Sequence, residues 1–488
     1  MLASVFAEEV LWSTAGALSG LTAYWLRAFS GAFEVGLDGV NLFVSCPNVK
    51  GAITVNSWST DAHSIYRCPP VLASRHCVFC LKVGGSPGMM RPFSSRMKIN
   101  DMRRRTDRIL TTHVGSLARP RNVLDLLFAK ERQEEYDADL FESSVCDAVS
   151  DIVKEQVGVG IDIVCDGEQS KSSFLTYIAE RLKGFSPSEK QGEDLWVESR
   201  ETIAFPEFYD AHRKAREGLV AKPVKLVCTG PVTYDGHTVL QRDISNLKAA
   251  AHAHGVGEAF MTAVSPSDVE GQQPNKFYES DEEYLFAVAE AMHEEYQAIV
   301  DAGLILQIDD PRLLTYYISQ PELSVTDCRQ WAELRVEALN HALKGLPEDR
   351  IRFHTCYGIN IGPRVHEMNL ADIVDIMLKV NAGAYLFEAG NPRHEHEWQV
   401  WENVKVPEGK SLIPGVISHS TPLVEHPELI AQRLIRFSNV VGKENIMAGS
   451  DCGFASFAAT EQEIHPSIVW AKFQNLAEGA RLASRKLW

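Results

Sequence analysis

From residue 105 onward, short runs of apolar and β-branched residues alternate with longer stretches of helical periodicity. Strands that are buried on both faces read as continuous apolar runs, and amphipathic helices repeat every three to four residues. The alternation therefore predicts a parallel sheet built from βαβ units. The predicted strands are RILTTHVGS from Arg108, IDIVCDGE from Ile161, VKLVCTGPVT from Val224, LILQIDDP from Leu304, IRFHTCYG from Ile351, AYLFEAGNP from Ala384, SLIPGVISH from Ser411 and IMAGSDCG from Ile446.

Two of the predicted helices have clear boundaries. The segment DEEYLFAVAEAMHEEYQAIVDAG follows Ser280, and Glu283 stands three residues after that serine, which is the spacing of a capping box. The HPELIAQRLIRFSNVVG helix begins after His426 and ends at Gly442, a residue type typical of helix ends. Eight strand–helix units of this kind predict an α/β fold, a closed (β/α)8 TIM barrel.

Polar side chains stand where most of the predicted strands end. Catalytic groups of such barrels lie at these carboxyl ends, whose loops form one face. A polar residue also marks the change from strand to loop, which explains any one position. Two cysteines, two histidines and three carboxylates at one rim instead favour a chemical site. The strand ends supply Ser116, Glu168, Thr233, Asp309, His354 with Cys356, Glu388, His419 and Cys452.

Four of these residues have the donor atoms of a zinc site. In His354-Thr355-Cys356 the first and third side chains of a strand point the same way, so both can reach one ion. Glu388 ends the predicted sixth strand and Cys452 the eighth. One imidazole, two thiolates and one carboxylate suit tetrahedral Zn²⁺. The spacing therefore predicts a zinc centre at the mouth of the barrel.

Three other sequence features resemble metal sites more weakly. His394-Glu395-His396 and His252-Ala253-His254 fall in predicted loop or helix-start sequence, so we interpret both as solvated polar residues. Cys77-Val78-Phe79-Cys80 would need two more ligands to form a zinc site, and Cys46 and Cys68 are the only nearby cysteines. We interpret the pair as free thiols.

The first hundred residues differ from the rest. They carry a net charge of +3 and show no sustained helical or strand period. An uncharged run from Val10 to Leu26 is interrupted by Ser, Thr and Gly and is shorter than most membrane spans. We expect two regions: residues 1–100, a poorly ordered extension, a transit segment or a mistaken start upstream of Met97 or Met102; and residues 104–488, the catalytic barrel.

Charge and cysteine content exclude some classes of partner. The formal net charge of −17 repels phosphate backbones, so neither nucleic acid nor a membrane is an expected partner. Ten unevenly spaced cysteines in 488 residues do not form a disulfide framework. We expect a reducing compartment, the cytoplasm, or the mitochondrion if residues 1–100 are a transit segment.

The motifs HTCYG, LFEAGNP and GSDCGF, in that order at strand ends, resemble the catalytic domain of cobalamin-independent methionine synthase, and more closely its short single-barrel relatives. THVGS, CDGEQSKSSFLTYIAERLKGF, TGPVT, LQIDDP and the VEHPELIAQRL helix add to the resemblance, which runs from about Thr111 to the C-terminus. It implies a barrel of the methionine synthase/uroporphyrinogen decarboxylase type. It also implies a methyltransferase of methionine biosynthesis that acts on homocysteine and a methyl or alkyl donor.

The same resemblance implies roles for individual residues. Catalytic zinc is held by His354, Cys356, Glu388 and Cys452, and the substrate thiol binds it as a thiolate. The amino and carboxylate groups of homocysteine are gripped by Ser116, Glu168 and Asp309. Because Asp309 is not among the ligands, its replacement by alanine is expected to leave zinc content unchanged.

Two positions depart from the family pattern. His237 stands where a tryptophan stacks on the folate pterin, which indicates a smaller or different electrophile than polyglutamyl folate. In PGVISHSTP an ungapped match places Ser420 at the position of a histidine that assists donor protonation, and His419 is adjacent. We expect His419 to take that catalytic role with a slight shift of the match; the alternative is that no residue takes it.

Three alternatives stay open. Epoxide opening by a thiol, as in epoxyalkane:coenzyme M transferases, keeps the zinc but needs arginines for a sulfonate. A metal-free decarboxylase of the uroporphyrinogen type needs arginines for many carboxylates and no thiolate pair. A zinc barrel without activity, serving in binding or sensing, is the third.

Overall fold

Seven short strands form a curled parallel sheet in the computed structural model, with neighbours in the order β13-β12-β11-β10-β9-β8-β5. Every pair in this sheet is parallel. The helices that follow the strands therefore return along the outside, as βαβ units require. The strands are β5 Ile163–Val164, β8 Glu258–Val264, β9 Ile305–Asp309, β10 Ile351–His354, β11 Ala384–Phe387, β12 Ser411–Ile417 and β13 Gly449–Ser450.

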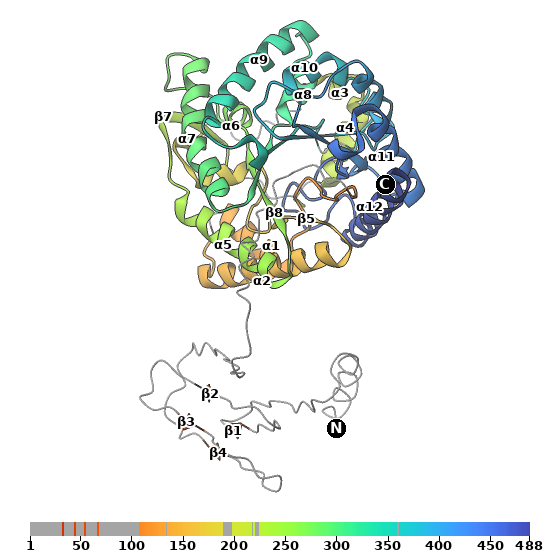
Figure 1. The fold of residues 1–488 in the computed structure, drawn as a ribbon. Coiled ribbons are helices and arrows are strands. Elements are labelled where there is room, and N and C mark those ends of the chain that lie inside the picture. Colours follow the sequence, from red (N-terminus) through yellow and green to blue (C-terminus); the bar gives the residue numbers. More distant parts are fainter. Residues whose placement is uncertain are drawn as a thin grey trace. The chain divides into compact units, whose positions relative to one another are not determined.

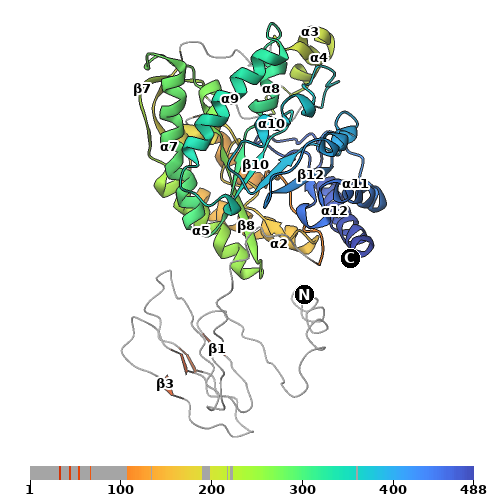
Figure 2. The same cartoon turned by 45° about the horizontal axis from the view of Figure 1, so that its top comes forward.

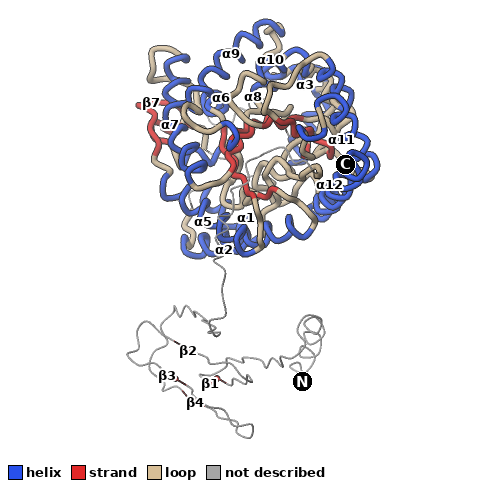
Figure 3. Tube along the Cα trace, viewed as in Figure 1, coloured by secondary structure: helices blue, strands red, loops and turns tan. Residues whose placement is uncertain are grey.

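The segment around Thr111 closes the ring of strands. Thr111 forms a parallel bridge with Ala448, beside β13. Its carbonyl oxygen accepts the backbone N–H of Ile163 at 3.1 Å, on the side of β5. The residues before Gly115 thus occupy the eighth strand position, and Figure 3 shows the curled arc of strands inside a layer of helices. The predicted TIM barrel is confirmed.

Helices surround the barrel (Figures 1 and 2). The two helices with predicted boundaries are present, and the Ser280 side chain accepts the Glu283 backbone N–H as expected. The helices are α1 Arg121–Glu131, α2 Ala138–Gly158, α3 Arg200–Ala204, α4 Pro206–Arg216, α5 His237–Ala253, α6 Pro266–Gln272, α7 Asp281–Asp301, α8 Arg312–Ser319, α9 Val325–Ala342, α10 Val374–Met377, α11 Pro427–Val441 and α12 Pro466–Leu487, with 3-10 turns η1 Thr176–Glu180, η2 Glu348–Arg350, η3 Leu370–Asp372, η4 Glu395–Glu402 and η5 Lys443–Asn445.

One predicted strand is wrong. The VKLVCTGPVT segment forms β7 Leu226–Tyr234, which pairs antiparallel with β6 Leu182–Pro187 and is not part of the barrel. The third barrel strand is β8, with the sequence EAFMTAV. Both segments are β-branched and apolar, and sequence alone does not show which of them pairs with β5 and β9. As a result Thr233 is exposed outside the barrel, and Thr262 of β8 lies inside it.

Apolar side chains fill two layers. A large cluster lies between the strands and the helices, and a smaller one, including Phe260, Leu386 and Ile413, lies inside the barrel. The upper part of the interior is polar instead, because β9 and β10 direct Asp309 and His354 inward at their carboxyl ends. The side-chain alternation of buried strands thus forms a floor of apolar residues below a polar mouth.

Contacts between Cα atoms divide the chain into Met1–Arg96 and Met97–Trp488. The structure describes residues 107–132, 134–188, 198–216, 218–219, 224–358 and 361–488. Before them it describes only the antiparallel pairs β1 Ala32–Phe33 with β4 Tyr66–Arg67 and β2 Phe43–Val44 with β3 Ile53–Thr54. The predictions for residues 1–100, including the Cys77–Cys80 pair, otherwise lie outside the described residues. No helix within the described ranges is long and apolar enough to cross a membrane.

A shortened chain tests the proposed boundary. The barrel's strands, helices and core clusters lie after residue 107. A protein that begins at Met97 is therefore expected to be soluble and to have the activity and melting temperature of the full chain. Circular dichroism and a turnover assay measure both properties. Aggregation of the shortened protein alone would show that the first 96 residues cover part of its core.

Candidate metal centre and substrate pocket

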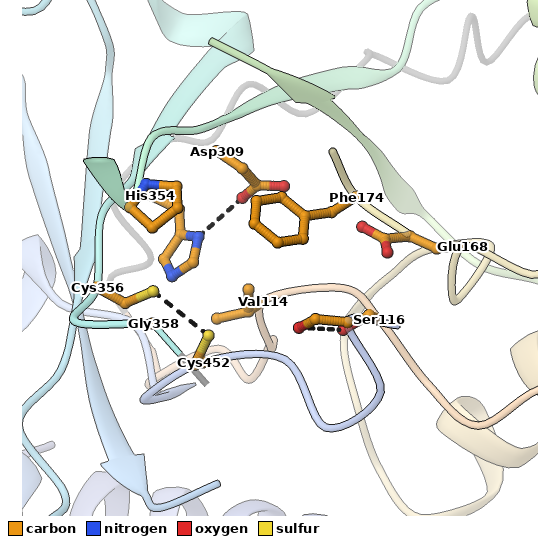
Figure 4. Close-up of a pocket in the computed structure, with 11 residues that line it drawn as sticks. Val114, Ser116, Glu168, Phe174, Asp309, His354, Cys356, Gly358 and Cys452 are labelled. Carbon is orange, nitrogen blue, oxygen red and sulfur yellow. Dashed lines mark hydrogen bonds and ion pairs between the residues drawn. The ribbon is translucent and has the colours of Figure 1, made fainter. Parts of the chain in front are cut away.

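A cavity with about 350 Å³ of empty space, part of it open to solvent, lies at the carboxyl ends of the barrel strands (Figure 4). Segments from five strand ends meet in it, so residues far apart in sequence become neighbours. Its walls are Val114, Ser116, Glu168, Phe174, Asp309, Pro311, His354, Cys356, Gly358, Cys452 and Ser456. Six of the eight predicted site residues are among them.

A histidine and two cysteines lie on one side of this cavity. The sulfur atoms of Cys356 and Cys452 are 3.4 Å apart. His354 Nε2 has no hydrogen-bond partner among the described residues, and one nitrogen of this ring lies within 4.8 Å of both sulfurs. Two thiolates on one tetrahedral Zn²⁺ at about 2.3 Å each are about 3.8 Å apart. The donor set and the unsatisfied buried nitrogen therefore fit a zinc ion.

The protonation of these groups follows from burial and contact. Contact with Cys452, together with burial, raises the pKa of the Cys356 thiol well above its ordinary value. Burial opposes a charge on His354, but Cys356 and Asp309 outweigh it and raise the pKa of His354 to about 10. A metal would displace these protons, so its binding is expected to weaken at low pH.

Asp309 has a second contact that the sequence did not reveal. Its Oδ1 lies 2.8 Å from His354 Nδ1, across the strand pair β9 and β10. A carboxylate in this position orients a metal-binding imidazole, and its loss lowers metal affinity about 10- to 100-fold. The expectation that Asp309→Ala leaves zinc content unchanged is therefore revised: we expect weaker metal binding as well as weaker substrate binding.

Glu388 and His419 lie outside the walls of the cavity. The carboxylate of Glu388 accepts the Tyr357 backbone N–H at 2.9 Å, Arg364 at 2.6 Å and Asn391 at 2.7 Å. Burial opposes its ionisation, yet Arg364 and nearby histidines hold the pKa of Glu388 below its usual value. Its oxygens cluster with His419 and Asp451, separately from the two sulfurs. To reach the metal, Glu388 would have to give up some of these bonds.

His419 is almost completely buried. Neither ring nitrogen makes a hydrogen bond of normal geometry among the described residues, although the ring lies near the Gly358 backbone. Burial lowers the pKa of His419 to about 4. The adjacent Ser420 instead hydrogen-bonds to Ser418 at 2.9 Å. The catalytic role of His419 stays a prediction; at neutral pH this ring is uncharged, so it would receive a proton before donating one.

The opposite wall of the cavity contains Glu168 and Ser116. Glu168 accepts the Thr262 hydroxyl at 3.0 Å and lies 3.7 Å from Arg119, and its second oxygen is unsatisfied. Burial raises the pKa of Glu168 against the opposing charges of Lys171 and Arg119. A bound ammonium group would satisfy this oxygen and keep the carboxylate ionised.

Backbone geometry also marks this wall. Glu168 has φ of 58°, and the other non-glycine residue with positive φ in the described ranges is Arg364, at 57°. Such a conformation costs about 1–3 kcal/mol and often occurs at functional sites. A Cβ at Gly453 would lie 2.0 Å from the Ser116 hydroxyl, so the glycine leaves room for that serine.

Sequence reasoning missed a buried network behind Glu388. His394, interpreted as solvated, is instead 3% exposed and bonded to Glu397 at 2.8 Å and Glu367 at 2.9 Å. These bonds outweigh burial and raise the pKa of His394 to about 9. Arg364 joins Glu367 to Glu388, at 2.5 and 2.6 Å. The surrounding sequence NPRHEHEW gave no periodicity that could have shown this burial.

Four other histidines that the sequence singled out lie away from this network. His396 is exposed, as expected, and His252 and His254 lie at the end of α5. His237, at the start of α5, is 63% exposed, lies 3.3 Å from Glu294 and does not line the cavity. The ring of His237 is therefore not part of the wall of this cavity.

Comparison with known proteins places the chain in a family. Residues 109–469 match the family described as "Cobalamin-independent synthase, Catalytic domain". The chain belongs to this family. The match confirms the resemblance seen in HTCYG, LFEAGNP and GSDCGF and the assignment to enzymes of the methyltransferase class.

Individual relatives agree with this placement. A methionine synthase of Thermococcus kodakarensis is 24% identical over 391 residues, covering 77% of this chain and 94% of the relative. A 5-methyltetrahydropteroyltriglutamate–homocysteine methyltransferase of Thermotoga petrophila is 22% identical and covers 73% of this chain, but only 43% of the relative is matched. Among solved structures, a B12-independent methionine synthase from a Shewanella species in complex with selenomethionine has a TM-score of 0.58 at 18% identity, covering 78% of this chain and 99% of the other. The last likeness supports the fold.

Proposed function

We propose that this enzyme transfers a methyl group to the sulfur of homocysteine, giving methionine, at a zinc ion held by His354, Cys356 and Cys452. The observation that supports this most strongly is one cavity with metal-binding thiols on one wall and two buried carboxylates with a serine on the other. Glu388 stays a predicted fourth ligand. To bind the metal, its carboxylate would have to give up some of its present hydrogen bonds.

The opposite wall suits an amino acid. The ammonium group of homocysteine would be bound by Glu168 and Asp309, and its carboxylate by the hydroxyl of Ser116, which now contacts Ser456 at 3.3 Å. A sulfonate thiol would meet the same two carboxylates and be repelled. This charge pattern argues against the alternative of epoxide opening with a coenzyme M-type thiol.

Zinc, when bound, would hold the substrate sulfur as a thiolate at neutral pH. The chain's own residues would orient it: His354 is fixed by Asp309, and the carboxylates place the amino-acid end. Phe174 lies between Asp309 and Glu168 in Figure 4 and forms part of the cavity wall. The second substrate would then meet a sulfur held in a fixed position.

We further propose a methyl donor more compact than polyglutamyl folate. The cavity at the metal-binding residues would have to accommodate homocysteine and the donated group together. His237 is exposed and contributes no ring to the wall.

The described cysteines are unpaired, which suits the reducing cytoplasm as the predicted location.

A turnover assay tests the proposed function. The zinc-loaded full chain is incubated with homocysteine and, in parallel, with methylated folate, a sulfonium donor or a quaternary ammonium donor, and methionine is quantified. We expect methionine only when homocysteine and zinc are both present, and more from a compact donor. Zinc-dependent thiol binding without methionine from any donor would instead support a non-catalytic barrel.

A further inference from the structure

Below the metal centre, two more polar residues occupy the barrel interior. In the register of β9 and β10, Arg352 pairs with Gln307 one layer beneath His354 and Asp309. Side chains two apart in a strand share a face, so all four point inward. Arg352 and Gln307 are 0% exposed. Such groups are expensive to bury unless each makes defined hydrogen bonds.

Arg352 fixes the orientation of the Gln307 amide. A guanidinium can only donate, and its Nε lies 2.7 Å from Gln307 Oε1. Its other nitrogens donate to the Thr112 hydroxyl and the His113 carbonyl, both at 2.8 Å. The face of Phe260 lies 3.4 Å from the guanidinium carbon. Each nitrogen of this guanidinium thus donates one hydrogen bond, and the amide oxygen of Gln307 must face Nε.

The amide nitrogen of Gln307 then faces upward. It donates to the Val114 carbonyl oxygen at 2.5 Å and to Asp309 Oδ1 at 2.7 Å. The carbonyl is an obligate acceptor, which independently confirms the orientation of the amide. Asp309 Oδ1 therefore acts as an acceptor toward Gln307, and the same oxygen can accept the Nδ1–H of His354.

We propose that Gln307 and Arg352 are positioning residues, which through Asp309 keep the proton of His354 on Nδ1 and present Nε2 to the metal. The inference rests on the proposed zinc site. The unsatisfied Nε2 beside the two sulfurs is the end of this chain of bonds. Without the chain, the imidazole could rotate or change tautomer, and one of its two nitrogens would be lost to the metal.

A pair of matched variants tests the inference by zinc affinity. Gln307→Glu keeps the acceptor for Arg352 but turns an oxygen toward Asp309 and the Val114 carbonyl. Gln156→Glu makes the same change at another fully buried glutamine, whose amide nitrogen donates to the carbonyls of Ile152 and Cys165. Competition with a chromophoric chelator measures zinc binding, and Asp309→Ala serves as the reference for loss.

We expect Gln307→Glu to weaken zinc binding about 10- to 100-fold, as Asp309→Ala does, and Gln156→Glu to leave it near that of the wild type. If both glutamine variants bind zinc with the affinity of the wild type, the inference about Gln307 is overturned, while the proposed zinc site itself is not contradicted. A wild type without tight zinc binding would overturn the proposed function itself.

A measurement on the wild type covers the case in which Gln307→Glu does not fold. Protein with ¹⁵N-labelled histidine is loaded with ¹¹³Cd²⁺, and the nitrogen that couples to cadmium is identified by NMR. We expect coupling to Nε2 of His354, with a proton on Nδ1. Coupling to Nδ1 would contradict the orientation that Gln307 and Arg352 impose.

Discussion

Cys452→Ala is expected to lose most of its zinc and to reduce methyl transfer at least about 1,000-fold. The variant removes one of two thiolates whose sulfurs are 3.4 Å apart, which leaves the site one donor short of a tetrahedral set. A loss of 1,000-fold corresponds to about 4 kcal/mol of transition-state stabilisation. Elemental analysis and the turnover assay give both numbers.

The matched control is Cys328→Ala, which truncates a cysteine equally buried in α9. It is expected to lose some stability through its cavity but to keep zinc and activity. Because Cys452 lies at the rim of the barrel, the melting temperature of its variant should change no more than that of the control. Full zinc content in Cys452→Ala would show that this ligand assignment is wrong.

Glu168→Gln is expected to weaken homocysteine binding about 10- to 100-fold at unchanged zinc content. The substitution keeps the shape and the contact with Thr262 but removes the charge that faces the ammonium group. A charge-assisted hydrogen bond contributes about 1.5–3 kcal/mol, and about 1.4 kcal/mol is tenfold in affinity. Steady-state kinetics with varied homocysteine measure the change in KM.

The control for Glu168→Gln is Glu270→Gln, which weakens ion pairs with Arg312 and Arg335 away from the cavity.

The pH dependence of homocysteine binding provides a second test. Burial raises the pKa of Glu168, so homocysteine binding should be lost, as pH falls, at a higher pH than an exposed glutamate would give. An unchanged KM in Glu168→Gln would remove this carboxylate from the substrate site.

The sequence predicted most of the barrel because its strands are continuous apolar runs that end in polar residues. The exception is informative. β7 has the composition of a barrel strand, yet it pairs with β6. The actual third strand, β8, was not predicted because its sequence EAFMTAV is a weak strand signal. Pairing partners are set by tertiary contacts, which local propensity does not contain.

The candidate site was predictable as far as side chains follow strand ends. Ser116, Asp309 and Cys452 line the cavity because parallel strands deliver their carboxyl ends to one face. The contact of Asp309 with His354 depends on strand register, and the burial of His394 depends on Glu367 and Glu397 from separate turns. Neither register nor loop packing leaves a periodic trace in sequence.

X-ray absorption at the zinc edge tests the central claim most directly, because it counts sulfur atoms around the metal before and after substrate is added. The zinc-loaded full chain is predicted to show two sulfurs, from Cys356 and Cys452, and three once homocysteine is bound. A sulfur count that stays at two while methionine is still formed would contradict the proposed role of zinc in binding the substrate thiol.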